Sequence, residues 1–206
     1  MQQSKTSARP LIASQFVLPL AGLLVVGFYA TAPVHAHEAH HHGHGAVTAT
    51  AADVTLFDLP LLRPDGAVTT LPTALADKPA AIVGFFYSEC DVACPITTKL
   101  LQGVMAKLSE VERARTRVIL LTLDPDTDTP EVLTEYAAQM KVPDDWTLLT
   151  GKPAEVNRVL VGLGAYASDL ESHPQQLLVR AAPDAGFLRL FGLPDAGAIR
   201  GTLARR

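Results

Sequence analysis

Two cysteines directly follow a continuous apolar stretch, and this order fixes how the middle of the chain can fold. The stretch spans residues 80–87 and is rich in aromatic and branched residues, which is typical of a buried strand. It leads into the run Cys90-Asp91-Val92-Ala93-Cys94-Pro95. Proline suits the first turn of a helix, where the missing N–H has no partner to lose. The pattern therefore predicts a strand, a short loop and a helix, with both sulfurs beside the positive end of that helix.

This position favours chemistry at sulfur. The partial positive charge at a helix N-terminus lowers the pKa of a nearby thiol and favours the thiolate, which binds metals or attacks disulfides. A structural disulfide is the alternative, but bridging residues four apart stabilises by only about 2 kcal/mol, against almost 5 for a hundred-residue loop. The spacing is one residue longer than the Cys-x-x-Cys of redox enzymes, so both sulfurs can turn towards one external atom. We therefore expect Cys90 and Cys94 to be functional.

Residues 1–36 have the pattern of an export signal. Lys5 and Arg9 precede an apolar stretch over residues 11–30, and Val34 and Ala36 form a small-x-small ending. The stretch is long for a signal core and nearly long enough to span a bilayer, so cleaved signal peptide and retained membrane anchor both stay open. Either alternative places the rest of the chain in an oxidising compartment, on the periplasmic or extracytoplasmic face of the inner membrane.

Residues 37–52 form a low-complexity segment, which we expect to be a disordered tail because it lacks the apolar spacing needed to pack. Its histidines could capture copper or zinc, or the segment could be a solvated linker. Beyond Ala36 the chain carries all 21 acidic residues and all but two of the 17 basic ones. No basic cluster is interleaved with aromatic residues, so nucleic acid is not an expected partner.

Residues 53–206 alternate strands and helices, as in one α/β domain. Residues 54–58 and 67–70 flank Pro64-Asp65-Gly66, a turn signal that predicts an N-terminal hairpin. After the central strand we expect helices over 95–108, 130–140, 153–163 and 195–203, and strands over 118–123, 146–149, 176–180 and 187–191. The last two strands form a terminal hairpin. This order predicts a thioredoxin-like three-layer sandwich with an N-terminal and a terminal β-hairpin, and its site outside the carboxyl ends of the strands.

His173 is the only histidine of this domain, in a polar loop just before the terminal hairpin. A lone histidine is commonly a surface residue without a role, but this loop borders the strand–helix turn in a thioredoxin-like sheet. Two thiolates and one imidazole form a soft donor set suited to Cu(I), and with an extra ligand to Cu(II). Zinc would require a fourth protein ligand for a closed site, and none is evident in the sequence.

An acidic loop, Asp124-Pro125-Asp126-Thr127-Asp128-Thr129-Pro130, follows the second buried strand. Its simplest interpretation is a turn followed by a helix cap, with Asp128 or Thr129 as the cap. The alternative makes Asp124 a supporting or docking group near the metal. We favour the capping interpretation for any single acid here.

Together these motifs resemble the Sco/SenC copper chaperones. Residues 85–95 are similar to that family's Cys-x-x-x-Cys-Pro motif, and residues 123–131 to its Asp-Pro-x-x-Asp-Thr-Pro segment. Trp146-Thr147-Leu148-Leu149-Thr150-Gly151 fits as well, as does a histidine ahead of the terminal hairpin. The resemblance covers residues 53–193. Two positions depart from the family pattern: Asp91 stands where proline is usual, and His173 is flanked by Ser172 and Pro174 instead of Asp and Ser.

The resemblance implies that Cys90, Cys94 and His173 bind copper, and that the protein delivers it to a receiving protein such as a cytochrome oxidase subunit with a binuclear copper site. It favours a metallochaperone over an enzyme. The alternative is a thiol–disulfide oxidoreductase in which Cys90 and Cys94 are the redox-active pair that keeps partner cysteines reduced. A peroxidase-like or redox-sensing domain is a weaker third interpretation. A monomer, with membrane anchoring through residues 11–30 if the leader is retained, is the default expectation.

Overall fold

The computed structural model of the protein describes residues 49–90, 93–192 and 194–205. The predicted leader over residues 1–36, the histidine-rich residues 37–48 and Asp91 lie outside these ranges. Within the described ranges, the helices are all too short or too polar to cross a membrane.

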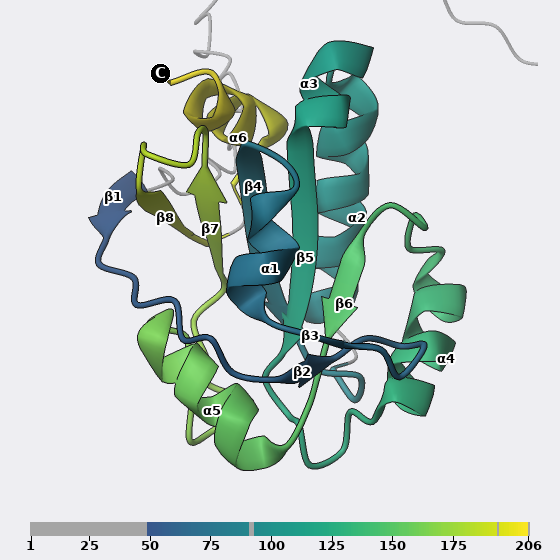
Figure 1. The fold of residues 1–206 in the computed structure, drawn as a ribbon. Helices are drawn as coiled ribbons and strands as arrows, with labels where there is room; N and C mark the ends of the chain where they lie inside the picture. Colours follow the sequence, from purple (N-terminus) through teal and green to yellow (C-terminus); the bar gives the residue numbers. More distant parts are fainter. Residues whose placement is uncertain (1–48, 91–92, 193, 206) are drawn as a thin grey trace, which may run out of the picture. The chain divides into compact units, whose positions relative to one another are not determined.

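A mixed sheet forms the centre of the described domain (Figure 1). Its six strands lie in the order β1-β8-β7-β4-β5-β6. They are β1 (Ala49–Ala52), β4 (Ala80–Phe86), β5 (Thr116–Thr122), β6 (Thr147–Leu149), β7 (Gln176–Arg180) and β8 (Phe187–Phe191). β4, β5 and β6 are parallel to one another. β7 pairs antiparallel with β4, β8 with β7, and β1 with β8. The carboxyl ends of β4 and β5 and the start of β7 therefore meet at one end of the sheet.

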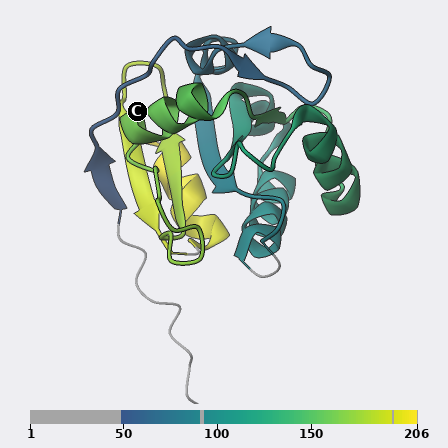
Figure 2. The same cartoon turned by 90° about the horizontal axis from the view of Figure 1, so that it is seen from below.

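Helices cover both faces of the sheet. They are α1 (Leu71–Ala76), α2 (Ala93–Lys107), α3 (Glu110–Arg115), α4 (Pro130–Met140), α5 (Pro153–Gly162) and α6 (Ala196–Leu203). Buried side chains of α2, α4 and α6 belong to one apolar cluster, and those of α1 and α5 to another. Figure 2 shows α5 and α2 on opposite sides of the sheet. The layers confirm the predicted thioredoxin-like α/β sandwich.

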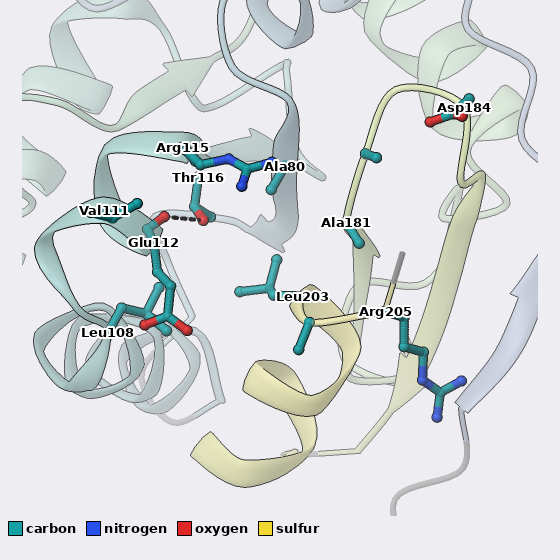
Figure 3. A pocket seen from close by; sticks show the side chains of 12 residues that line it. Ala80, Leu108, Val111, Glu112, Arg115, Thr116, Ala181, Asp184, Leu203 and Arg205 are labelled. Atoms are coloured by element: carbon teal, nitrogen blue, oxygen red, sulfur yellow. Dashed lines mark hydrogen bonds between the residues drawn. The ribbon is translucent and has the colours of Figure 1, made fainter.

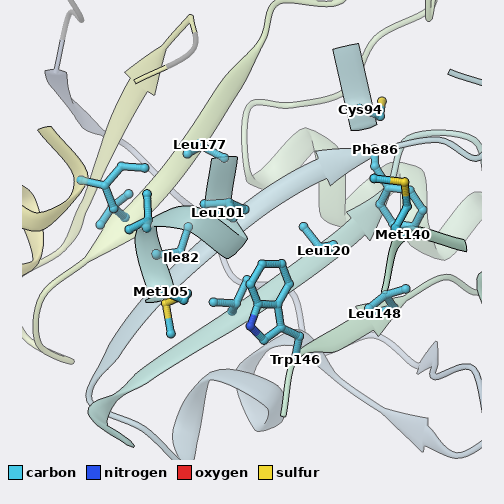
Figure 4. Packing of buried hydrophobic residues seen from close by; sticks show 14 of the residues in the cluster. Ile82, Phe86, Cys94, Leu101, Met105, Leu120, Met140, Trp146, Leu148 and Leu177 are labelled. Atoms are coloured by element: carbon cyan, nitrogen blue, oxygen red, sulfur yellow. The ribbon is translucent and has the colours of Figure 1, made fainter. Parts of the chain in front are cut away.

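The central strand β4 is buried on both faces, which explains its continuous apolar sequence. Ile82 and Phe86 enter the cluster under α2, whereas Val83 and Phe85 enter the opposite one, as the two-residue repeat of a strand requires. Figure 4 shows the first cluster, in which Phe86 packs with side chains from α2, α4 and β6. A Cβ on Gly84 would lie 3.0 Å from Leu120 Cδ2, so glycine permits this close packing.

The N-terminal hairpin exists, but its first strand is misplaced in the prediction. β2 is Leu61–Leu62, paired with β3 (Val68–Thr69), instead of residues 54–58. The backbone N–H of Thr55 donates to Gly162 O at 2.8 Å, so residues 54–58 run along the end of α5 and do not pair with β3. The predicted turn is confirmed: Arg63 donates its N–H to Ala67 O at 3.0 Å.

The expected disordered tail is wrong for its last four residues. Ala49–Ala52 form β1 and pair with β8 from Ala49 opposite Leu190 to Ala52 opposite Phe187. Three of the four residues are exposed, so the strand is held by backbone hydrogen bonds to β8 and has almost no core contact of its own. An apolar pattern could not reveal such a strand.

Candidate functional site

The cysteine pair lies where β4 ends and α2 begins. Cys90 donates its backbone N–H to Tyr87 O at 3.2 Å, and its sulfur accepts the backbone N–H of Cys94 at 3.2 Å. The sulfur of Cys90 therefore caps one of the free N–H groups of the first helical turn. Both cysteines are reduced and buried, with 8% and 1% of their surface exposed. The predicted place of the pair is confirmed.

The predicted lowering of thiol pKa is wrong for Cys94. Burial raises the pKa of its thiol, and the hydrogen bond with Cys90 raises it further. The sulfur belongs to the apolar cluster that contains Phe86 and Met140 (Figure 4). Desolvation by these neighbours outweighs the helix N-terminus, so Cys94 is a protonated thiol at neutral pH.

Tyr87 connects the cysteines to the histidine. Burial raises the pKa of its hydroxyl to about 12, and a hydrogen bond with the Cys90 side chain contributes to the shift. On its other side the Tyr87 ring meets the His173 ring edge-to-face, with centroids 5.8 Å apart and planes at 75°. Tyr87 was not among the predicted site residues. Its position at the end of the buried strand, shortly before Cys90, was the sequence feature that could have identified it.

His173 is half-buried in the loop before β7. Its Nδ1 lies 2.5 Å from Leu170 O, and its Nε2 lies 3.3 Å from Gln175 Nε2. Asp169 fixes the same loop, since it accepts hydrogen bonds from the Glu171 N–H and the Ser172 hydroxyl. The imidazole is thus held at the end of the sheet where the cysteines lie.

His173 contacts Tyr87, and Tyr87 contacts Cys90, so Tyr87 lies between the histidine and the cysteines. Across the described ranges, His, Cys, Asp and Glu side chains nowhere form a group of three or more that could hold a metal ion. The ligand set of Cys90, Cys94 and His173 therefore stays a prediction.

Asp128 is a supporting residue whose role the sequence did not reveal. Its carboxylate is fully buried and accepts the backbone N–H of Ser88 at 3.1 Å and the hydroxyl of Thr122. Thr129, the other capping candidate, is the N-cap of α4. Asp124 donates its backbone N–H to the Thr122 hydroxyl at 2.9 Å. Asp128 thus ties the loop that carries Cys90 to the end of β5.

A pocket of about 670 Å³ lies at the opposite end of the strands (Figure 3). It is bounded by the start of β4 at Ala80, by the α2–α3 segment with Leu108 and Glu112, and by Leu203 and Arg205 near the C-terminus. Neither cysteine nor His173 lines it, so its size does not make it the candidate site.

Comparisons with known proteins point to one family. A family model described as SCO1/SenC matches residues 66–182, more than half of the chain. The SCO1 protein homolog of Bacillus subtilis (strain 168) is 31% identical over 71 residues, which cover 34% of this chain and 36% of the homolog. The chain thus matches about a third of the length of this curated relative.

Two solved structures share the fold. Arabidopsis thaliana ScoI with copper bound has a TM-score of 0.60 and 23% identity, and the match covers 74% of this chain and 96% of that one. BsSco, described as a member of the Sco family of cytochrome c oxidase assembly proteins with a disulfide switch, has a TM-score of 0.59 and 19% identity, with coverages of 76% and 98%. With the family match over residues 66–182, these findings place the chain in the SCO1/SenC family.

Proposed function

We propose that this protein is an extracytoplasmic copper chaperone, which binds copper through Cys90, Cys94 and His173 and delivers it to a partner, the binuclear copper site of cytochrome c oxidase. The observation that carries the proposal is the chain of contacts from Cys94 through Cys90 and Tyr87 to His173 at one end of the sheet. Family membership and the copper-bound relative support it.

The donor atoms fit copper as a cargo. Two sulfurs and an imidazole are soft ligands, which favour Cu(I) and also accept Cu(II) with a further ligand. Because the Cys94 thiol is protonated at neutral pH, copper must displace a proton when it binds there. Release is then assisted by any partner that can return protons and offer its own sulfurs. Such exchange suits a carrier better than a permanent metal site.

The location is part of the proposal. The leader pattern of residues 1–36 supports export, with residues 11–30 as an anchor if the leader is retained. On that side of the membrane the chaperone would meet the copper-receiving domain of the oxidase.

Copper titration of the reduced protein tests the ligand set. The full chain is used with its tail histidines replaced by alanine, because their imidazoles would bind copper independently. We expect thiolate-to-Cu(II) charge-transfer bands that saturate at one equivalent and disappear in Cys90→Ser and in Cys94→Ser. His173→Ala should weaken binding. If His173→Ala binds copper as tightly as the parent, the proposed ligand set is wrong.

A thiol–disulfide oxidoreductase is the second candidate, favoured by two reduced cysteines that a 3.2 Å hydrogen bond from the Cys94 N–H to the Cys90 sulfur holds together. In that function the two thiols form a disulfide and pass two electrons and two protons to a partner disulfide, which becomes two thiols. No imidazole is needed for this exchange. Reduction of a copper-free oxidase-domain disulfide, at a rate unchanged in His173→Ala, would favour this function over copper delivery.

A further inference from the structure

The imidazole of His173 is held in one tautomer. A carbonyl oxygen can only accept a hydrogen bond, so the 2.5 Å contact with Leu170 O assigns a proton to Nδ1. In the neutral ring Nε2 then carries the lone pair. The histidine therefore offers a single nitrogen, Nε2, to a metal.

That nitrogen is already engaged by Gln175. The side-chain amide of Gln175 lies 3.3 Å from His173 Nε2 and can only act as donor to the lone pair there. The other end of the amide is held by Thr97, whose hydroxyl donates to Gln175 Oε1 at 2.9 Å. The backbone of Gln175 is fixed as well, since its carbonyl accepts the Gly192 N–H at 2.8 Å.

Thr97 belongs to the helix that starts with the cysteines. It lies three residues after Cys94 in α2 and is buried. The Thr97–Gln175–His173 connection therefore links the helix of the sulfurs to the loop of the imidazole. In this arrangement the ring lies beside Tyr87, and the described residues form no three-ligand cluster that could hold a metal ion.

We propose that Gln175 is a positioning residue that occupies the metal-binding nitrogen of His173 until copper replaces it, and that the Thr97–Gln175 hydrogen bond sets how readily this replacement occurs. This inference rests on the proposed copper-binding function. Copper bound by the sulfurs gains the imidazole only after the Gln175–His173 hydrogen bond breaks. Gln175 therefore lowers the affinity for copper and eases its release to a partner.

The size of the effect follows from the fraction of molecules whose imidazole is free. The apparent affinity falls in proportion to the population of the binding-competent form. One net hydrogen bond of ordinary strength shifts such a population about fivefold. Gln175→Ala should therefore bind copper about fivefold more tightly than the parent, because the Leu170 and Tyr87 contacts still orient the ring. Thr97→Val should shift affinity in the same direction by less.

The test measures copper affinity by competition with a chelator in the reduced full chain with alanine in place of the tail histidines. Gln102→Ala is the matched control, because Gln102 lies on α2 and donates to Met140 O and Lys141 O, away from His173. We expect tighter binding in Gln175→Ala, unchanged binding in Gln102→Ala, and no effect of Gln175→Ala when His173→Ala is also present. Equal or weaker binding in Gln175→Ala, or an effect that survives His173→Ala, would overturn the inference.

A second measurement uses the copper-free protein. Long-range proton–nitrogen spectra should show the His173 ring protonated at Nδ1, and the Nε2 resonance should move in Gln175→Ala but not in Gln102→Ala. A ring protonated at Nε2, or an Nε2 resonance unmoved by Gln175→Ala, would overturn the inference even where the parent binds copper. A parent that binds no copper overturns the proposed function, a result distinct from any change in the ring spectrum.

Discussion

Replacement of the buried Asp128 carboxylate is the sharpest test of how the cysteine loop is held. Asp128 lies between the loop after β4 and the end of β5, with none of its surface exposed. It accepts the Ser88 N–H with both oxygens, at 3.1 and 3.3 Å, and also the Thr122 hydroxyl. Asp128→Ala leaves these two donors without their acceptor, and Ser88 is only two residues before Cys90.

The expected loss follows from the two hydrogen bonds. A hydrogen bond to a carboxylate contributes about 1.5–3 kcal/mol, so Asp128→Ala should lower the free energy of unfolding by about 3–6 kcal/mol. That is a large part of the roughly 5–15 kcal/mol typical of a domain. Asp128→Asn is the matched control, because its carbonyl can accept the Ser88 N–H and its amide can donate to the Thr122 hydroxyl. We expect the asparagine variant to lose about 1 kcal/mol.

Urea unfolding of the reduced protein measures both values, and the rate of thiol labelling at Cys90 reports on the loop. Labelling should accelerate in Asp128→Ala and change little in Asp128→Asn. A loss below about 1 kcal/mol in Asp128→Ala would show that water or other groups satisfy the two donors. Equal losses in the two variants would show that the negative charge, and not the hydrogen-bond geometry, holds the loop.

Three further predictions concern the rest of the domain. Gly162→Ala would place a Cβ against the Thr55 carbonyl and 2.8 Å from the Phe57 ring, and should lower the free energy of unfolding by about 1–3 kcal/mol. In the control Gly103→Ala the added Cβ meets nothing within 4 Å, and the free energy of unfolding should rise by about 0.5–1 kcal/mol. Because the folded-state pKa of Cys94 is raised, the contribution of its thiol to stability is complete below about pH 8.5 and declines as the pH rises further. With rising pH the urea midpoint should therefore fall less steeply in Cys94→Ala than in the parent. Thr129→Ala removes the N-cap of α4 and should reduce the free energy of unfolding by about 1 kcal/mol; an unchanged urea midpoint would contradict that role.

The main elements could be predicted because their sequences allow few alternatives. The apolar run of β4 and that of β5 are too continuous for exposed strands, and the Pro130 start of α4 marks a helix. The two short helices α1 and α3 were missed. In α3 a signal existed, since Ser109 and Glu112 form a capping box, but six residues give too little periodicity to detect a helix.

The site could be predicted only in part from the sequence. The cysteine pair is local, so its place at a strand–helix turn follows from neighbouring residues. Asp128 could not be told from Asp124, because which acid is buried depends on how β4 and β5 are paired. The raised pKa of Cys94 depends likewise on side chains from α4 that pack over it, and these are distant in sequence.

The two sulfurs share their apolar cluster with Leu101 of α2 and Tyr136 of α4, so the candidate site is also part of the hydrophobic interior. Unfolding would disperse the sulfurs, and a metal held by them would stabilise the folded chain according to its concentration and dissociation constant. If the sulfurs bind copper as proposed, the melting temperature should rise when copper is added, and a competing copper chelator should return it to the lower value.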